Sequence, residues 1–259
     1  MDTIDPVKLS RRLQTVAQRI PQGSRLSDIG SDHALLPVYA VQQGLAISAV
    51  AGEVAAGPLD AAKRQIEAAG LSDSIAARLG NGLDVIAPGE VSVITICGMG
   101  GCTIQSILDR GAQRLAGVER LILQPNVGEA AVRKWLLRHN WLLMDEQIVE
   151  EDERFYEILT ATPITNADQQ RENEALYEPF ERNDCRIDRE LLLQMGPYLL
   201  RHPTQELEAK WLDEIRKREY IMNQMAMSAS EDAARKRAIM LTETERTKEV
   251  LQCMRMDRR

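Results

Sequence analysis

The feature that most constrains the fold is a regular alternation of short apolar runs with helical stretches over the first half of the chain. The apolar runs are rich in isoleucine, valine and leucine and cover residues 25–30, 46–53, 74–80, 91–98 and 120–125. Such alternation predicts a parallel sheet with crossover helices. We expect those helices at residues 57–69, 101–115 and 128–139. The runs at 141–152 and 154–163 have only a short break between them, which predicts an antiparallel pair that closes the sheet.

Helical segments precede and follow this region. Asp5 followed by Pro6 is a helix start, and apolar residues keep helical spacing after it until a later proline ends the helix. The polar stretch from 162 to 178 predicts a linker or a fraying helix. We therefore predict two domains, residues 1–163 and 164–259.

The second predicted domain contains two long charged helices. The apolar face of the first is formed by Leu207, Trp211, Ile215, Met222 and Met225. The sequence SASE at 228–231 is a capping box that starts the second helix, which runs to the C-terminus. Two such helices predict an antiparallel hairpin resembling a coiled coil, although residues 242–249 are too polar for a strong apolar seam.

Composition and charge exclude several classes of protein. With 44% hydrophobic residues, no apolar run long enough to span a bilayer and no secretory pattern, the chain is expected to be cytoplasmic and not to bind membranes. A net charge of −7 argues against non-specific coating of nucleic acid. A local basic patch is still compatible with the clusters at 216–218, 235–237 and 255–259, although a solvated helix face explains any single cluster better.

The four cysteines are scattered along the chain, at Cys97, Cys102, Cys185 and Cys253, and only three histidines accompany them. Neither a disulfide framework nor a zinc site has this spacing. We therefore expect reduced thiols and no bound metal.

Ligands of an open parallel sheet bind beyond the carboxyl ends of its strands, so we expect the site residues in the loops at those ends. The loop after the first strand contains Asp28, Gly30, Ser31, Asp32 and His33. It lacks the G-x-G-x-x-G pattern that lets backbone approach a pyrophosphate. A carboxylate in this turn would repel a diphosphate, and it suits a ligand that carries an ammonium or sulfonium group.

Three further strand ends carry polar or small residues. Glu53 ends the second strand, 23 residues after Gly30, near the spacing at which an acidic residue binds a ribose. The loop GNGLD (80–84) follows the third strand, and CGMGG (97–101) follows the fourth and leaves space for a substrate. Each loop alone is also typical of an ordinary turn. Four of them in this order indicate S-adenosylmethionine bound in a class I methyltransferase fold.

Seven segments within residues 8–162 carry a closer likeness: LSRRLQTVAQRIPQG, DIGSDHALLPVYAV, AGEVAAGPLDAAKRQIEAAGL, GNGLDVI, CGMGG, RLILQPN and EEDERFYEIL. In this order they resemble the TrmK family of bacterial tRNA (adenine-N1)-methyltransferases. The resemblance implies a Rossmann-like, class I methyltransferase domain followed by a C-terminal helical coiled-coil domain. It also implies methylation of N1 of the adenosine at position 22 of tRNA, with S-adenosylmethionine as the methyl donor.

The resemblance assigns residues to the cofactor and the substrate. For the cofactor these are Asp28 and Gly30 to His33 at the methionine end, Glu53 at the ribose, Asn81, Gly82 and Leu83 at the adenine, and the nearby Gly98, Met99 and Gly100. Arg12 is assigned to the cofactor carboxylate or an RNA phosphate, although a helix-surface arginine is an equally good interpretation. For the target base they are Gln124, Pro125, Asn126 and Tyr156. The positive charge of the cluster at 216–218 makes Arg216, Lys217 and Arg218 candidates for contacts with the rest of the tRNA.

The reaction does not require the protein to remove a proton first, because neutral adenine N1 has a free lone pair. Attack on the methyl group needs positioning and desolvation more than a general base. The candidate catalytic residues are Asp32, Asp84 and Asn126, and either aspartate can polarise the amino group or offset the charge of the methylated ring. His33 is a candidate base, although an ordinary turn histidine explains it better. A paired adenosine must also be extruded from its helix.

Two other functions are compatible with the sequence. The acceptor of the methyl group can be another RNA, a protein or a small molecule, although a small-molecule site needs no charged helical tail. Alternatively, the chain is a non-catalytic adaptor whose helical hairpin holds a partner. For the enzyme we expect a monomer that binds tRNA.

Overall fold

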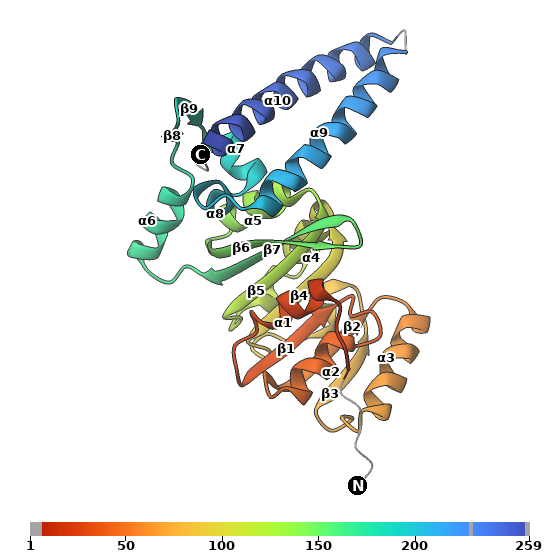
Figure 1. Ribbon diagram of the computed structural model, residues 1–259. Coiled ribbons are helices and arrows are strands. Elements are labelled where there is room, and N and C mark those ends of the chain that lie inside the picture. Colours follow the sequence, from red (N-terminus) through yellow and green to blue (C-terminus); the bar gives the residue numbers. More distant parts are fainter. Residues whose placement is uncertain (1–6, 228–229, 257–259) are drawn as a thin grey trace. The chain divides into compact units, whose positions relative to one another are not determined.

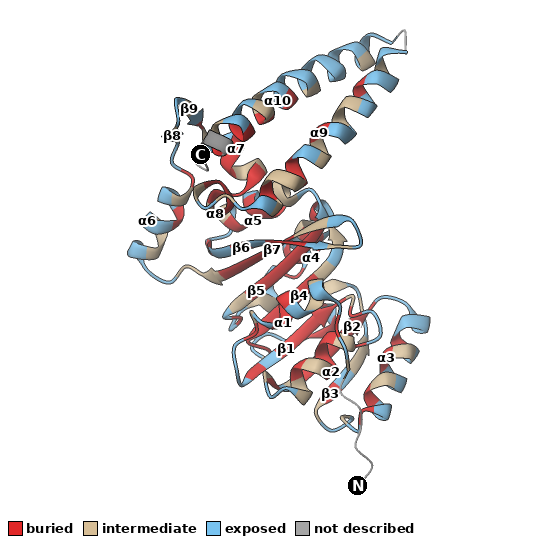
Figure 2. Cartoon of the chain, in the orientation of Figure 1, coloured by how far each residue is buried: buried red, intermediate tan, exposed pale blue. Residues whose placement is uncertain are grey.

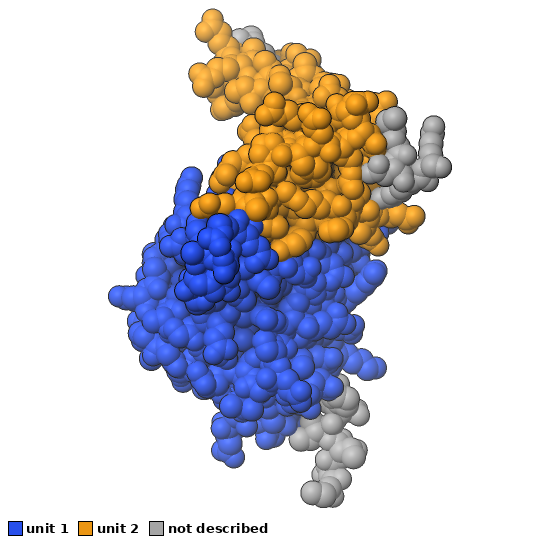
Figure 3. All heavy atoms as spheres, turned by 90° about the vertical axis from the view of Figure 1, so that its left-hand side faces the viewer, with its two compact units in different colours: residues 1–173 blue, residues 174–259 orange. Residues whose placement is uncertain are grey.

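The computed structural model describes residues 7–227 and 230–256 (Figure 1). The chain forms two compact units, residues 1–173 and 174–259, which Figure 3 distinguishes by colour. The division falls inside helix α6 (Ala167–Leu176), whereas the predicted boundary lies earlier, at the end of the last strand of the sheet. No helix in the described part of the chain is long and apolar enough to cross a membrane.

The first unit is built on a seven-stranded sheet with the order β3-β2-β1-β4-β5-β7-β6. Its strands are β1 (Ser24–Ile29), β2 (Ala46–Glu53), β3 (Ile75–Leu79), β4 (Val93–Gly100), β5 (Arg120–Val127), β6 (Trp141–Glu151) and β7 (Arg154–Pro163). The strands β1 to β5 pair in parallel, and β7 pairs antiparallel with both β5 and β6. The predicted parallel sheet and its closing antiparallel pair are therefore confirmed.

The helices of the first unit are α1 (Arg11–Ala17), α2 (Leu35–Gln42), α3 (Ala56–Ala68), α4 (Gly101–Arg110) and α5 (Glu129–Arg138), with short 3-10 helices η1 (Gly82–Val85) and η2 (Ala112–Leu115). The helix expected at 101–115 is divided at Gly111, where a side chain would overlap with Leu83. The first helix begins after Ser10, whose hydroxyl accepts a hydrogen bond from the backbone of Leu13. The predicted start at Asp5 lies outside the described residues.

The direction of the crossovers decides where these helices lie. From β1 the chain moves through β2 to β3 toward one edge of the sheet, and from β4 it moves through β5 toward the other. Because such crossovers are right-handed, α2 and α3 cover one face and α4 covers the opposite face. Strands such as β4 and β5 are consequently buried on both sides, as the red strands at the centre of Figure 2 show. The strand order reverses between β1 and β4, so ligands are expected at their carboxyl ends.

The second unit contains the predicted antiparallel helical hairpin, formed by α9 (Gln205–Ala226) and α10 (Glu231–Met256), which lie side by side in Figure 1. Four of the five apolar residues predicted for one face of α9 are buried, and the fifth, Met225, is half-buried. In α10 the predicted polar segment buries Thr244 and Thr247, whose hydroxyls donate to carbonyls of their own helix at 2.7 and 2.8 Å. Part of the SASE motif, residues 228–229, lies outside the described residues.

Smaller elements precede the hairpin and were not predicted. They are β8 (Phe180–Arg182), β9 (Cys185–Ile187), α7 (Arg189–Met195) and α8 (Pro197–Arg201). The guanidinium of Arg201 donates to the backbone carbonyls of Leu176 and Pro197, at 2.8 and 3.2 Å, and so joins the end of α6 to α8. These short elements lack the periodicity that makes longer ones visible in a sequence.

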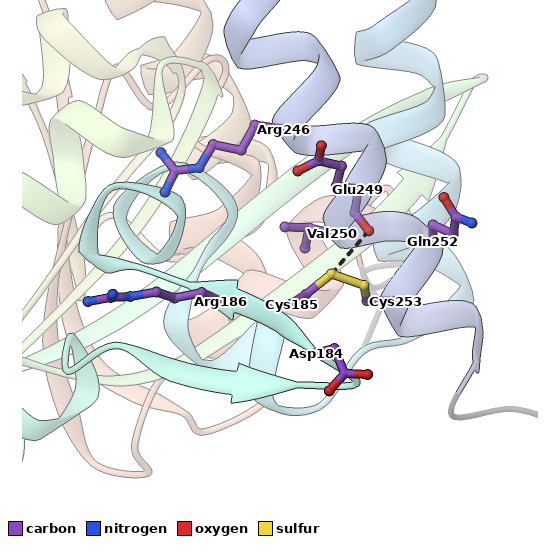
Figure 4. A pocket seen from close by; sticks show the side chains of 8 residues that line it. All are labelled: Asp184, Cys185, Arg186, Arg246, Glu249, Val250, Gln252 and Cys253. Atoms are coloured by element: carbon purple, nitrogen blue, oxygen red, sulfur yellow. Dashed lines mark hydrogen bonds between the residues drawn. A yellow bond between two sulfur atoms is a disulfide. The ribbon is translucent and has the colours of Figure 1, made fainter.

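The expectation of four reduced cysteines is wrong for two of them. Cys185 of β9 and Cys253 of α10 form a disulfide across 68 residues, with their Cα atoms 6.3 Å apart, whereas Cys97 and Cys102 are free thiols. The spacing of the cysteines did not predict this pair, because α10 runs antiparallel to α9 and so brings its C-terminal end close to β9. The disulfide lines a surface pocket of about 490 Å³ together with Asp184, Arg186, Arg246, Glu249, Val250 and Gln252 (Figure 4). Among the described residues, no group of three or more histidine, cysteine or acidic side chains could hold a metal ion.

Candidate cofactor and substrate site

The loop after β1 is held by a buried carboxylate. Asp28 is 4% exposed, and its two oxygens accept hydrogen bonds from the hydroxyls of Ser31, at 2.7 Å, and Thr95 of β4, at 2.6 Å. Burial raises the pKa of Asp28 to about 6, an effect opposed by these two hydrogen bonds. Asp28 therefore braces the turn and supplies charge beneath it. Thr95 was not among the predicted residues, although its place in β4 beside β1 is a consequence of the strand order.

The turn itself has an unusual backbone. After Gly30, at φ 68°, the three residues Asp32, His33 and Ala34 all have positive φ, at 43°, 67° and 55°. Successive left-handed residues other than glycine are costly and persist only where their surroundings impose them. The backbone N–H of Asp32 donates to the carboxylate of Glu53 at 2.8 Å, which fixes the turn from the neighbouring strand.

Two predicted site residues of this turn extend into solvent. The side chains of Asp32 and His33 are 90% and 58% exposed, and the carboxylate lies 3.5 Å from the imidazole Nε2. Glu53, by contrast, is 6% exposed, and its burial raises the pKa of its carboxyl group. Glu53 thus lies at the end of β2 as predicted, and it has a structural partner in the turn that the sequence did not reveal.

The loop after β3 combines a constrained backbone with one buried and one hydrogen-bonded side chain. Gly82 has φ 61°, and Leu83 is 1% exposed, so Leu83 can offer only its backbone to a ligand. Asn81 accepts a hydrogen bond from Arg110 at 3.1 Å. Two exposed apolar residues that were not predicted, Val54 after β2 and Leu79 at the end of β3, are adjacent in sequence to Glu53 and to this loop. Their position at strand ends is the signal that could have identified them.

A hydrogen-bonded network joins the ends of β4 and β5. The side-chain oxygen of Gln124 accepts from the backbone N–H of Gly98 at 3.0 Å, and its amide nitrogen donates to Asn126 Oδ1 at 3.1 Å. Asn126 in turn donates through Nδ2 to the carbonyl of Gly98 at 2.8 Å. Gly98, with φ 76°, carries no side chain that would obstruct these contacts. The structure thus brings three predicted residues from two strands into one cluster.

Arg12 enters the same cluster from α1. Its guanidinium donates to Gln124 Oε1 and lies 5.3 Å from the centre of the Tyr156 ring. Its backbone N–H donates to Glu151 at 3.1 Å, and its Nε lies 3.8 Å from the same carboxylate. The interpretation of Arg12 as a helix-surface residue is therefore not supported. Glu151, at the end of β6, was not predicted, because nothing local connects it with α1.

Tyr156 is directed toward Arg12 by the alternation of side chains along β7. The next residue, Glu157, points to the opposite face, where it and Glu146 of β6 contact Arg133 of α5. All three of these charged side chains are completely buried. Because two strands and a helix share this ion cluster, the face that carries Tyr156 is fixed.

The predicted catalytic residues do not form one cluster. Asp84 follows β3 and lies 3.6 Å from Arg114, whereas Asn126 lies on β5. Asp84 lies in η1, which packs against β2 and α4. The contacts of Asp84 and Asn126 thus involve different partners.

The basic residues 216–218 lie on α9 of the second unit and are largely compensated by acidic neighbours. Lys217 lies 2.8 Å from Asp213 and 3.0 Å from Glu214, and Arg216 lies 3.3 Å from Asp213. The hydrogen bond from Lys217 lowers the pKa of Asp213, so this carboxylate stays charged. Arg218 stacks over Trp211 at 5.6 Å. This cluster has less free positive charge than its sequence suggests.

Comparison with known proteins identifies the family. The TrmK family model, described as tRNA (adenine(22)-N(1))-methyltransferase, matches residues 26–249. The chain belongs to the TrmK family. This TrmK chain is 41% identical over 226 residues to the tRNA (adenine(22)-N(1))-methyltransferase of Bacillus subtilis (strain 168), which covers 87% of the chain and 89% of the relative.

Solved structures agree with this assignment. The crystal structure of B. subtilis TrmK superposes with a TM-score of 0.82 at 40% identity, covering 95% of this chain and 99% of that one. A Streptococcus pneumoniae protein described as a putative tRNA methyltransferase, in complex with S-adenosyl-L-methionine, gives a TM-score of 0.76 at 37% identity, covering 94% and 100%. This TrmK chain therefore has the predicted Rossmann-like methyltransferase sheet followed by C-terminal helices.

Proposed function

We propose that this chain transfers the methyl group of S-adenosylmethionine to N1 of the adenosine at position 22 of tRNA. The observation that carries the proposal is membership of the TrmK family over residues 26–249. The related S. pneumoniae structure contains S-adenosyl-L-methionine, which supports the same cofactor here. A non-catalytic adaptor would not need the strained turn and the polar network described above, since neither is required to stabilise a helical hairpin.

The residues at the switch point between β1 and β4 fit this cofactor. Gly30 and Gly98 have φ of 68° and 76°, which favours glycine at both positions, and the side chain of Met99 packs directly against Gly30. When bound, S-adenosylmethionine supplies an electrophilic methyl group on a positively charged sulfonium. Asp28, Asp32 and Glu53 surround the turn with negative charge, which suits the sulfonium and the ammonium group of the ligand.

We assign the remaining contacts from their positions in the sheet. Glu53 at the end of β2 holds the ribose, and the loop from Asn81 to Leu83 holds the adenine of the cofactor, with Val54 and Leu79 as apolar neighbours. Asp84 belongs to this end of the site and takes no part in the chemistry. Asp32 is the acidic residue that stays accessible above the turn, where it can offset developing positive charge.

The target base is held at the ends of β4 and β5. Asn126 is exposed and hydrogen-bonded, Pro125 is buried beneath it, and Tyr156 offers a ring face beside Arg12. The lone pair of adenine N1 attacks the methyl carbon while the bond from carbon to sulfur breaks, so no proton has to leave first. The protein contributes in-line positioning and exclusion of water.

The tRNA outside the target nucleotide requires a basic surface. We propose that the helical hairpin supplies it, chiefly through Arg235 and Arg237 of α10, which are exposed and make no ion pair within the described residues. We further propose that the enzyme is a monomer that works in the cytoplasm, where its tRNA substrate is found. Light scattering of the purified protein measures its mass, and a dimer would contradict that part of the proposal.

The activity is tested by incubating the protein with tritiated S-adenosylmethionine and a tRNA transcript that has adenosine at position 22. We expect one labelled methyl group per tRNA, identified as N1-methyladenosine by mass spectrometry. A matched transcript with guanosine at this position should accept none, because guanine N1 carries a proton. Equal labelling of the two transcripts, or of a short unstructured oligonucleotide, would contradict the proposal.

A further inference from the structure

The orientation of the Gln124 amide is fixed by backbone groups. Its oxygen accepts from the N–H of Gly98 at 3.0 Å, and its nitrogen donates to the carbonyl of Pro125 at 2.9 Å. A backbone N–H can only donate and a carbonyl can only accept. If the amide were reversed, its NH2 would lie against the N–H of Gly98 and its oxygen against the carbonyl oxygen of Pro125. The side chain of Gln124 therefore has a single stable orientation.

Gln124 has no hydrogen-bonding capacity left for a ligand. An amide offers two acceptor sites and two N–H donors. Gly98 and Arg12 occupy the acceptor sites, and Pro125 and Asn126 occupy the donors. The residue is also completely buried. Any influence of Gln124 on the target base must therefore pass through a neighbouring side chain.

That neighbour is Asn126, which is exposed and only half satisfied. Its Oδ1 accepts from Gln124 at 3.1 Å and its Nδ2 donates to the carbonyl of Gly98 at 2.8 Å. Reversing this amide would place its NH2 against the NH2 of Gln124 and its oxygen against a carbonyl oxygen. One acceptor site on Oδ1 thus remains open in a fixed position beside the end of β4.

We propose that Gln124 is a positioning residue that holds the Asn126 amide so that Oδ1 accepts a hydrogen bond from the 6-amino group of the target adenine. This inference rests on the proposed function. The amino group lies next to N1, so the contact orients the ring and leaves the attacking lone pair free. Guanine has an oxygen at position 6 in place of the amino group, and this acceptor would be repelled by the acceptor Asn126 Oδ1.

The same contact favours the transition state over the bound substrate. As N1 bonds to the methyl carbon, the ring becomes positively charged and its amino N–H becomes a stronger donor. A fixed acceptor therefore binds the amino group more tightly in the transition state than in the ground state. Loss of the contact should consequently lower kcat more than it raises KM.

The experiment compares two tRNA substrates, one with adenosine and one with purine riboside at position 22. Purine riboside keeps the N1 lone pair and lacks the 6-amino group. The measured quantity is the ratio of kcat/KM for the two substrates, in the wild type and in the variants Asn126→Ala, Gln124→Glu and the double variant. The intrinsic reactivity of each base is the same for the wild type and for every variant. A change in this ratio between them therefore reports a change in the contact with the 6-amino group. Gln22→Glu is the matched charge control, because Gln22 lies in an exposed turn at the amino end of β1, whereas the candidate site lies at the carboxyl ends of the strands.

The Gln124→Glu carboxylate still accepts from Gly98 and Arg12, but it cannot donate to Asn126. Asn126 then either keeps Oδ1 against a carboxylate oxygen, or turns its NH2 toward the carboxylate and its oxygen toward the Gly98 carbonyl. In both cases Oδ1 is no longer held as an acceptor for the base. We expect the adenosine preference to fall roughly tenfold in Gln124→Glu and in Asn126→Ala, which corresponds to one hydrogen bond of about 1.4 kcal/mol. The double variant should match Asn126→Ala, because both changes act through one contact. The control should keep the wild-type ratio.

An unchanged ratio in Asn126→Ala would overturn the inference. Effects that multiply in the double variant would overturn the role of Gln124, since they would show that it acts by another route. Thermal unfolding with and without S-adenosylmethionine confirms that each variant is folded. If Gln124→Glu does not fold, Gln124→Met, which has a similar volume and cannot donate to Asn126, replaces it with the same expected fall in the ratio. A wild-type enzyme that methylates neither substrate would refute the proposed function, and this inference with it.

Discussion

Asp28 should make the stability of this enzyme depend on pH in a direction opposite to that of most carboxylates. Burial raises the pKa of its carboxyl group from 3.8 to about 6 in the folded chain. At about pH 3 and below the group is mostly protonated in both the folded and the unfolded chain. As the pH rises toward 6, the unfolded chain releases this proton while the folded chain still holds it. Since the folded chain binds more protons in this range, its free energy of unfolding falls.

The size of the effect follows from the same values. A difference of about 2 pH units, at about 1.4 kcal/mol per unit, gives a loss of about 3 kcal/mol between about pH 3 and pH 7. Other groups act in the opposite sense. Glu90 lies 2.7 Å from Arg78 and has a lowered pKa, so its contribution grows as the pH rises. The contribution of Asp28 must therefore be isolated by comparing the wild type with a variant.

Asp28→Asn is the suitable perturbation. The amide keeps an oxygen that accepts from one hydroxyl, and its N–H can donate to the other, so the contacts with Ser31 and Thr95 are retained. The variant has no titrating group at this position, and it should lose about 3 kcal/mol less than the wild type between about pH 3 and pH 7. Asp60→Asn, which removes an exposed carboxylate from α3, should follow the wild-type profile.

The assay is urea unfolding at a series of pH values and constant ionic strength. A Trp211→Phe background restricts the fluorescence signal to Trp135 and Trp141, which lie in the first unit. Profiles of Asp28→Asn and the wild type that run parallel across this range would refute the reasoning. They would show that the buried carboxyl group titrates as it does in the unfolded chain.

Two further predictions concern the ligands. Glu53→Ala should weaken S-adenosylmethionine binding by about 1.5–3 kcal/mol in calorimetry, because a charge-assisted hydrogen bond is lost. The exposed control Glu67→Ala should leave the affinity unchanged. An unchanged affinity in folded Glu53→Ala would contradict the ribose assignment. Replacing Arg235 and Arg237 with alanine should flatten the salt dependence of tRNA binding by up to roughly one unit of slope per residue, and more than replacing the ion-paired residues of 216–218. The reverse order would place the RNA on α9.

Local sequence patterns determined the secondary structure of the first unit. Apolar runs of strand length alternating with helical stretches predicted all seven strands, because side-chain periodicity and turn residues act over a few neighbouring positions. They also indicated which loops meet at one edge of the sheet, since the carboxyl ends of parallel strands coincide there. Asp28, Glu53 and Gly98 could therefore be named as candidate site residues before any contact was known.

The contacts of those residues depended on the tertiary structure. Gln124 of β5 meets Arg12 of α1 across 112 positions, and Glu151 meets Arg12 across 139, because a helix at the start of the chain packs beside the last strands of the sheet. Thr95 reaches Asp28 because β4 is inserted next to β1. Strand order and register follow from the packing of the whole core, and no short segment encodes them.

The sequence by itself determined the fold class, the order of the loops and the family likeness, because each of these rests on local pattern or on motifs that can be read one at a time. Only the tertiary structure decided that Cys185 and Cys253 are joined, that Asp84 lies beside Arg114, and that the amide of Gln124 has one orientation. These are relations between residues distant in the chain. They are fixed by the directions of strands and helices, which become defined only when the core is packed.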